Sequence, residues 1–202
     1  MFLVLEGLDG AGTTTQSARL VQWLGGLGLA VQPTREPTGG PVGRLIRTTL
    51  RGEPGSPRVE SLPWLFAADR ADHLHRLVEP ALARGAWVVS DRYLHSSLAY
   101  QSLTQPMEQV LALNATFRAP DLTLFLDVSV DACLRRIEAR TDAPREIYEE
   151  RERLERISAL YQQGLDLLIA RGDRVVRLEG ELSVDEVSEA VRARVAPLVG
   201  AE

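Results

Sequence analysis

A glycine-rich turn close to the first residue constrains the fold more than any other part of this sequence. The apolar run at residues 2–5 leads almost directly into Gly7-Leu8-Asp9-Gly10-Ala11-Gly12-Thr13-Thr14, and a helix-favouring stretch follows it. The spacing matches the phosphate-binding loop G-x-x-x-x-G-K-[ST], or P-loop, with Thr13 in the position of the lysine. A strand, this loop and a helix in succession predict the first unit of an α/β fold.

Three properties of such a loop survive the loss of the lysine. Its backbone N–H groups can surround phosphate oxygens, the N-terminus of the following helix adds partial positive charge, and Thr14 can ligate Mg²⁺. We therefore predict phosphate contacts at Gly7, Gly10, Ala11, Gly12, Thr13, Thr14 and Thr15. What is missing is a cation that stabilises negative charge in the transition state of a phosphoryl transfer. A glycine turn made for packing alone is the alternative.

Short apolar runs alternate with longer helical segments along the rest of the chain. The predicted strands are residues 2–5, 29–32, 87–90, 122–126 and 175–178. The predicted helices are residues 13–24, 41–51, 59–84, 106–116, 130–140, 149–170 and 184–196, the last with a capping box at Ser183 and Glu186. This alternation predicts a three-layer α/β sandwich whose parallel sheet of about five strands is buried on both faces. No repeat interrupts it, so we expect one domain over residues 1–202.

The composition narrows the classes of partner and of location. The apolar stretches, such as residues 122–126, are far too short to cross a bilayer, so we expect a cytoplasmic protein without membrane contact. The formal net charge of -5 argues against broad nucleic-acid binding. The single cysteine, Cys133, lies in an apolar-periodic segment and is expected to be a buried structural thiol rather than a nucleophile.

Polar residues come directly after the strand predicted at residues 87–90. Asp91 and Arg92 follow that strand, where open α/β sheets place their ligand crevice. Asp91 can hold Mg²⁺ directly or through water, and the guanidinium fork of Arg92 can clamp phosphate oxygens. The sequence thus predicts a metal site at Thr14 and Asp91, with a surface ion pair at 91–92 as the alternative.

Two further segments carry candidate ligand-binding side chains. Thr34-Arg35-Glu36-Pro37 follows the second predicted strand, and Phe66-Ala67-Ala68-Asp69-Arg70 lies on a predicted long helix. Because Phe66 and Arg70 are four residues apart, they share one helical face, where the ring can stack on a base and the guanidinium can bind its edge. Ordinary core packing is the alternative for Phe66.

Taken together, these segments resemble the thymidylate kinase family. Besides the P-loop and the two segments above, the matching motifs are Asp91-Arg92-Tyr93-Leu94-His95-Ser96-Ser97-Leu98-Ala99-Tyr100-Gln101 and Pro120-Asp121-Leu122-Thr123-Leu124-Phe125-Leu126-Asp127. Their order and spacing match over nearly the whole chain. The resemblance implies a P-loop kinase fold, transfer of a phosphoryl group from ATP to dTMP in dTTP biosynthesis, Mg²⁺ as cofactor and a homodimer.

The resemblance also implies roles for single residues on the acceptor side. Asp9 matches the acidic residue near the transferring phosphate, and Glu36 the carboxylate near the sugar and the metal. The residues implied to contact dTMP are Arg35, Glu36, Phe66, Arg70, Arg92, Ser96, Ser97, Tyr100 and Gln101. Among them, Tyr100 occupies the place of a ribose 2′-hydroxyl and so favours deoxynucleotides. His95 matches no family role, and we expect it on a loop surface.

Residues 138–150 resemble the lid that closes over ATP in this family. A closing lid excludes water and brings cations onto the phosphates. Because positions 8–11 of the P-loop hold no arginine, the resemblance implies that Arg136, Arg140 and Arg145 are candidates for the catalytic charge. Solvated arginines at a helix end are the alternative.

Two other functions stay open at this point. The substitution at Thr13 is also compatible with a nucleotide-binding protein that has no useful catalysis. A related deoxynucleoside kinase would phosphorylate thymidine instead of dTMP, although the segments at 34–37 and 96–101 argue against it.

Overall fold

A computed structural model describes residues 1–139, 148 and 150–200. The strands are β1 (Phe2–Gly7), β2 (Val31–Arg35), β3 (Trp87–Asp91), β4 (Leu122–Asp127) and β5 (Val175–Glu179). The α-helices are α1 (Thr13–Gly26), α2 (Pro41–Leu50), α3 (Leu62–His73), α4 (Glu79–Ala83), α5 (Leu94–Tyr100), α6 (Met107–Asn114), α7 (Val130–Glu138), α8 (Arg151–Ala170) and α9 (Val184–Val199). Short turns of other helix types lie at Val59–Ser61 (η1), Leu74–Val78 (η2) and Gln101–Leu103 (η3).

The five strands form one parallel sheet in the order β2-β3-β1-β4-β5. This order places β1 in the centre, so the glycine loop that follows it lies at the middle of the carboxyl edge of the sheet. The predicted α/β sandwich of the P-loop kinase type is confirmed. The prediction that all strands are buried on both faces is wrong for the edge strands β2 and β5, which are partly exposed because each has only one neighbour.

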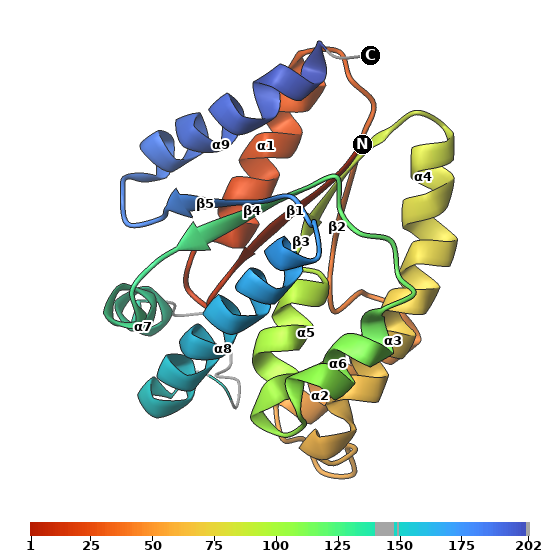
Figure 1. Cartoon of the computed structure of the whole chain (residues 1–202), viewed down its shortest axis with the longest axis vertical. Helices are drawn as coiled ribbons and strands as arrows, with labels where there is room; N and C mark the ends of the chain where they lie inside the picture. The colour runs from red at the N-terminus through yellow and green to blue at the C-terminus, as the bar shows by residue number, and fades with distance from the viewer. Residues whose placement is uncertain (140–147, 149, 201–202) are drawn as a thin grey trace.

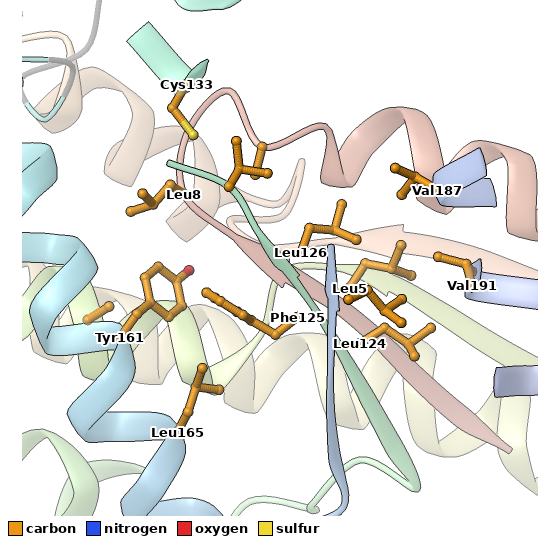
Figure 2. Packing of buried hydrophobic residues seen from close by; sticks show 14 of the residues in the cluster. Leu5, Leu8, Leu124, Phe125, Leu126, Cys133, Tyr161, Leu165, Val187 and Val191 are labelled. Carbon is orange, nitrogen blue, oxygen red and sulfur yellow. The ribbon is translucent and has the colours of Figure 1, made fainter. Parts of the chain in front are cut away.

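Helices cover both faces of the sheet (Figure 1). Helices α1 and α9 pack together on one face, and α5 and α8 pack together on the other. The side chains of β4 alternate accordingly: Leu124 and Leu126 point toward α9, whereas Phe125 points toward Tyr161 of α8 (Figure 2). The rings of Phe125 and Tyr161 lie 5.3 Å apart, so the core of this face reaches up to the base of the glycine loop.

Three segments of the structure differ from the elements predicted for them. Strand β2 spans Val31–Arg35 rather than 29–32, because its pairing with β3 runs as far as Arg35 and Asp91. The helix predicted at 59–84 is divided into η1, α3, η2 and α4. The segment after Arg92, predicted as a loop, forms helix α5, most of whose residues are buried.

Other predictions concern single residues and the membrane. The capping box of Ser183 and Glu186 is confirmed at the start of α9. Cys133 is buried, and burial raises the pKa of its thiol to about 12, which agrees with a structural role. His95, expected on a loop surface, is instead 1% exposed on α5, so that prediction is wrong. Within the described part of the chain, none of the helices has the length and apolar character needed to span a bilayer.

Candidate active site

The glycine loop adopts a conformation that leaves the N-terminus of α1 open. Gly10 and Gly12 have φ angles of 88° and 98°, which favour glycine, and a Cβ on Gly10 would lie 2.6 Å from the carbonyl oxygen of Cys133. No side chain caps α1, and its first turn contains no acidic residue. The N–H groups and partial positive charge of this helix therefore stay available to an anion. Thr13 is 5% exposed and packs within the loop.

The two predicted metal ligands lie side by side. The Thr14 hydroxyl donates a hydrogen bond to Asp91 Oδ2 at 2.5 Å, whereas Asp91 Oδ1 is buried without a hydrogen-bond partner. Among the described residues, no group of three His, Cys, Asp or Glu side chains is placed to hold a metal. One carboxylate and one hydroxyl suit Mg²⁺, which commonly takes its remaining ligands from water and substrate phosphates. The residues present therefore fit this ion.

Arg92 connects the glycine loop to the neighbouring cavity. Its Nη2 lies 2.7 Å from Asp9 Oδ1, and its Nη1 donates to the Gly7 carbonyl at 2.8 Å. The same Nη1 donates to the hydroxyls of Ser96 and Tyr161 at 3.0 and 3.1 Å. Arg92 is also the non-glycine residue with positive φ, at 73°, within the described ranges. This conformation is costly for a side chain with a Cβ, so surrounding contacts must hold it.

A cavity opens beside Arg92. It is lined by eight residues predicted from the sequence: Asp9, Glu36, Phe66, Arg70, Arg92, Ser96, Tyr100 and Gln101. Four further residues line it: Pro37, Leu50, Tyr93 and Tyr148. The structure thus gathers side chains from the P-loop, α3 and α5 and from the segments that follow β2 and β3 around one space.

Arg70 is held at the wall of this cavity by buried partners. Its Nε and Nη2 donate to Glu36 Oε2 at 3.0 and 2.6 Å, and Nη2 also donates to the Ser97 hydroxyl. Its Nη1 donates to Asn114 Oδ1. Arg70 is fully buried and its ion pair with Glu36 is as well, so the guanidinium has a fixed orientation before any ligand arrives.

Glu36 is fixed from a second side. His73 Nδ1 lies 2.9 Å from Glu36 Oε1, and His73 Nε2 lies 2.6 Å from the Thr34 hydroxyl. One Glu36 oxygen therefore faces Arg70, and the other faces His73. His73 lies one helical turn beyond Arg70, near enough for both to reach the same carboxylate.

Other predicted site residues lie elsewhere. Arg35 is exposed at the end of β2 and does not line the cavity, and Ser97 is buried behind Arg70. Arg136 donates to the Ala11 carbonyl at 3.2 Å and to the Gly180 carbonyl at 3.0 Å, on the outer side of the glycine loop. Arg140 and Arg145 lie outside the described residues.

Arg136 borders a second cleft. This cleft adjoins the glycine loop and is also lined by Gly10, Ala11, Gly12, Thr15, Gln16, Gly180, Leu182, Val184 and Val187. Its lining combines polar side chains, such as Arg136 and Gln16, with apolar ones, such as Leu182 and Val187. The glycine loop therefore borders two separate spaces.

Four residues close to the cavity were missed from the sequence: Glu6, His73, Asn114 and Tyr161. His73, Asn114 and Tyr161 fall in helical patterns where core packing is the default interpretation. A clearer signal existed for Glu6, because an acidic residue ends an otherwise apolar strand that was predicted to be buried.

Comparison with known proteins agrees with this geometry. The family model described as thymidylate kinase matches residues 5–191. The thymidylate kinase of Synechococcus sp. (strain WH7803) is 40% identical over 203 residues, covering 95% of this chain and 92% of that protein. The thymidylate kinase of Leifsonia xyli subsp. xyli (strain CTCB07) is 40% identical over 202 residues, covering 96% and 93%. The chain therefore belongs to the thymidylate kinase family of nucleoside-monophosphate kinases.

Proposed function

We propose that this protein transfers the γ-phosphoryl group of ATP to dTMP, giving ADP and dTDP. One observation carries the proposal. The cavity lined by Phe66, Arg70 and Tyr100 meets the P-loop at Asp9. Asp9 forms an ion pair with Arg92, which also lines the cavity. An acceptor in that cavity and a triphosphate on the loop would therefore meet at one place. Phosphoryl transfer depends mainly on such positioning and on charge stabilisation.

The acceptor is bound by groups with separate tasks. Phe66 lies on the cavity wall, where its ring can stack on the thymine, and Arg70 presents a clamped guanidinium to the edge of the base. Tyr100 fills the cavity wall close to Asp9, whose backbone N–H donates to the Tyr100 hydroxyl at 3.2 Å. In this position a tyrosine leaves no room for a ribose 2′-hydroxyl. Arg92 receives the acceptor phosphate with its guanidinium.

The donor is bound mainly by backbone groups. The loop from Gly7 to Thr15 surrounds the phosphates, and the cleft bordered by Arg136 and Gly180 receives the rest of the nucleotide. Thr14 and Asp91 would hold Mg²⁺, which would neutralise negative charge on the phosphate oxygens. No covalent intermediate with the protein is required, because the acceptor phosphate attacks directly in line.

The lysine's task falls to arginines. Within the described ranges, Arg92 and Arg136 donate to carbonyl groups of the P-loop, Arg92 on the acceptor side and Arg136 on the donor side. Arg140 and Arg145 join them as candidates from the lid. A homodimer and a cytoplasmic location stay predictions from the resemblance and the sequence.

The direct test is ADP formation by the purified protein with ATP, Mg²⁺ and one acceptor at a time. We expect turnover with dTMP and little with thymidine, dAMP or dGMP. Turnover with thymidine but not dTMP would make the protein a deoxynucleoside kinase. Calorimetric binding of ATP and dTMP without ADP formation would favour a nucleotide-binding protein without catalysis, the alternative that the buried Thr13 keeps open.

A further inference from the structure

Glu6 is a buried carboxyl group to which the reaction described above assigns no task. It is the penultimate residue of β1, is 0% exposed and lies directly before the first glycine of the P-loop. Burial raises the pKa of Glu6, whereas Arg92 and hydrogen bonds from Ser96, Tyr93 and Tyr161 act against that rise. A buried acidic group needs such partners, since an unpaired one would be strongly unfavourable.

Each oxygen of Glu6 has a separate set of partners. Oε1 accepts hydrogen bonds from the backbone N–H groups of Tyr93 and Ser96, at 2.7 and 3.2 Å. Oε2 accepts from the hydroxyls of Ser96 and Tyr161, at 2.7 and 3.0 Å. Four donors thus converge on one carboxylate, which is about its full accepting capacity.

The Oε1 contacts replace a local cap for helix α5. Tyr93 precedes this helix and no side chain near it in sequence caps the helix. Glu6 supplies the missing acceptor across the sheet, next to the positive end of the helix dipole. Tyr93, whose N–H Glu6 binds, follows Arg92 directly in the chain, so Glu6 holds the turn in which Arg92 has its φ of 73°.

The Oε2 contacts set the direction of two hydroxyl groups. Ser96 and Tyr161 both donate to Glu6, and Arg92 Nη1 donates to both hydroxyl oxygens at 3.0 and 3.1 Å. The Tyr161 hydroxyl also lies 3.2 Å from the Gly7 carbonyl and 2.8 Å from the Ser96 hydroxyl, but an ionised carboxylate is a stronger acceptor than either. With both protons turned toward Glu6, the oxygens present lone pairs to the guanidinium.

From these contacts we infer that Glu6 is a positioning residue that fixes Arg92 at the acceptor phosphate. Its carboxylate holds the backbone turn of Arg92 through Oε1 and orients the hydroxyl acceptors of its guanidinium through Oε2. Glu6 itself is not among the residues that line the cavity. The inference rests on the proposed function only in assigning the acceptor phosphate to Arg92.

The substitution Glu6→Gln tests this inference with little change of shape. The amide oxygen can still accept the two backbone N–H groups, but the amide nitrogen is a donor. It would donate to the hydroxyls of Ser96 and Tyr161, whose protons would turn to other acceptors such as the Gly7 carbonyl. The amide would then compete with Arg92 for the lone pairs of both hydroxyls, which weakens the orientation of the guanidinium while the cap of α5 remains.

Calorimetric titration with dTMP and with thymidine separates positioning from general damage, because only dTMP carries the phosphate. We expect E6Q to weaken dTMP binding by about tenfold or more and to leave thymidine binding within about twofold of the unchanged protein. Equal weakening of both ligands, or no change for either, would overturn the inference. Asp121→Asn is the matched control: this carboxylate binds the N–H of Phe2 at the other end of β1, and its loss leaves both affinities unchanged.

A second variant decides the question if E6Q does not fold. Tyr161→Phe removes one hydroxyl acceptor of Arg92 and keeps the Glu6 cap, and Tyr161 does not line the cavity. We expect a selective loss of dTMP affinity of about threefold; an equal loss for thymidine, or none, would overturn the inference. Arg92→Ala tests the proposed function separately. If it spares dTMP binding, the phosphate assignment is wrong; if it weakens only dTMP binding while E6Q changes nothing, only the task of Glu6 is wrong.

Discussion

The two sides of the glycine loop present different kinds of chemical group. On the acceptor side, charged side chains are buried and bind one another, as in the cluster of Arg70, Glu36 and His73. On the donor side, the loop offers backbone groups and helix α1, and Arg136 donates to the backbone carbonyls of Ala11 and Gly180. The acceptor side can therefore recognise one base and one phosphate with fixed side chains. In the proposed function, the donor side binds features common to nucleotides, and it depends less on any one side chain.

The largest expected effect comes from a substitution that breaks the buried cluster of Arg70, Glu36 and His73 on the acceptor side. Glu36→Ala leaves the Arg70 guanidinium buried without its ion-pair partner, so we expect a loss of about 3–5 kcal/mol in the free energy of unfolding. Urea denaturation measures it. Glu79→Ala, which breaks the exposed pair with Arg118, is the control and should cost about 1 kcal/mol or less. Similar losses for both variants would mean that burial does not distinguish the acceptor side.

The next effect concerns the phosphate on the acceptor side. We expect Arg92→Ala to lower kcat/KM for dTMP by about a hundredfold or more, since a charge near the transferring group is lost. Steady-state kinetics measure it. Arg35→Ala serves as the comparison: Arg35 is exposed and does not line the cavity, so we expect a change of about fivefold or less. A larger effect at Arg35 would place the phosphate nearer to β2.

A smaller effect is expected on the donor side. Arg136→Ala should raise KM for ATP by about tenfold, with KM for dTMP nearly unchanged, because Arg136 links the loop to Gly180 beside the second cleft. Thr13→Lys, assayed beside it, restores the missing cation. If Thr13→Lys raises kcat greatly in the unchanged background, the arginines do not fully replace the lysine. If Arg136→Ala raised KM for dTMP alone, the assignment of separate donor and acceptor sides would be wrong.

The smallest expected effect is on the pH dependence of stability, and it comes from the buried His95. Burial, followed by the charges of Arg70 and Arg171, lowers the pKa of His95 to about 3. The unfolded chain therefore binds a proton below about pH 6.5 that the folded protein does not bind, and stability falls as the pH falls from there toward 3. The raised pKa of Glu6 acts in the opposite direction, since the folded state holds that proton more tightly.

His95→Gln removes the first of these contributions. We expect the loss of unfolding free energy between pH 7 and pH 5 to shrink by about 1–2 kcal/mol, measured by urea denaturation at both values. His75→Gln, at an exposed position, is the control and should leave the pH dependence unchanged. An unchanged dependence in His95→Gln would mean that the buried imidazole takes up a proton in the folded state.

Neighbouring cavity residues could be predicted from the sequence where their spacing within one segment fixes their relative positions. Phe66 and Arg70 share a helical face because of their spacing, and both line the cavity. The P-loop spacing predicts Thr14 as a metal ligand and the position after a strand predicts Asp91, and their side-chain oxygens lie 2.5 Å apart. The contact of Arg35 with the acceptor stays a prediction; the strand pairing, which extends β2 to that residue, is not visible in the local pattern.

By itself, the sequence determined the five strands and their order along the chain, the phosphate loop and the family, because these depend on spacing along one chain. Only the tertiary structure decided which polar residues are buried and what they bind. Glu6 reaches Ser96 and Tyr161, and His95 is buried beside it, through contacts between segments far apart in the sequence. The loop that lacks a lysine is thus supported by a carboxylate one residue before it, and no local pattern could reveal that, since hydrogen bonds across a sheet leave no period in the sequence.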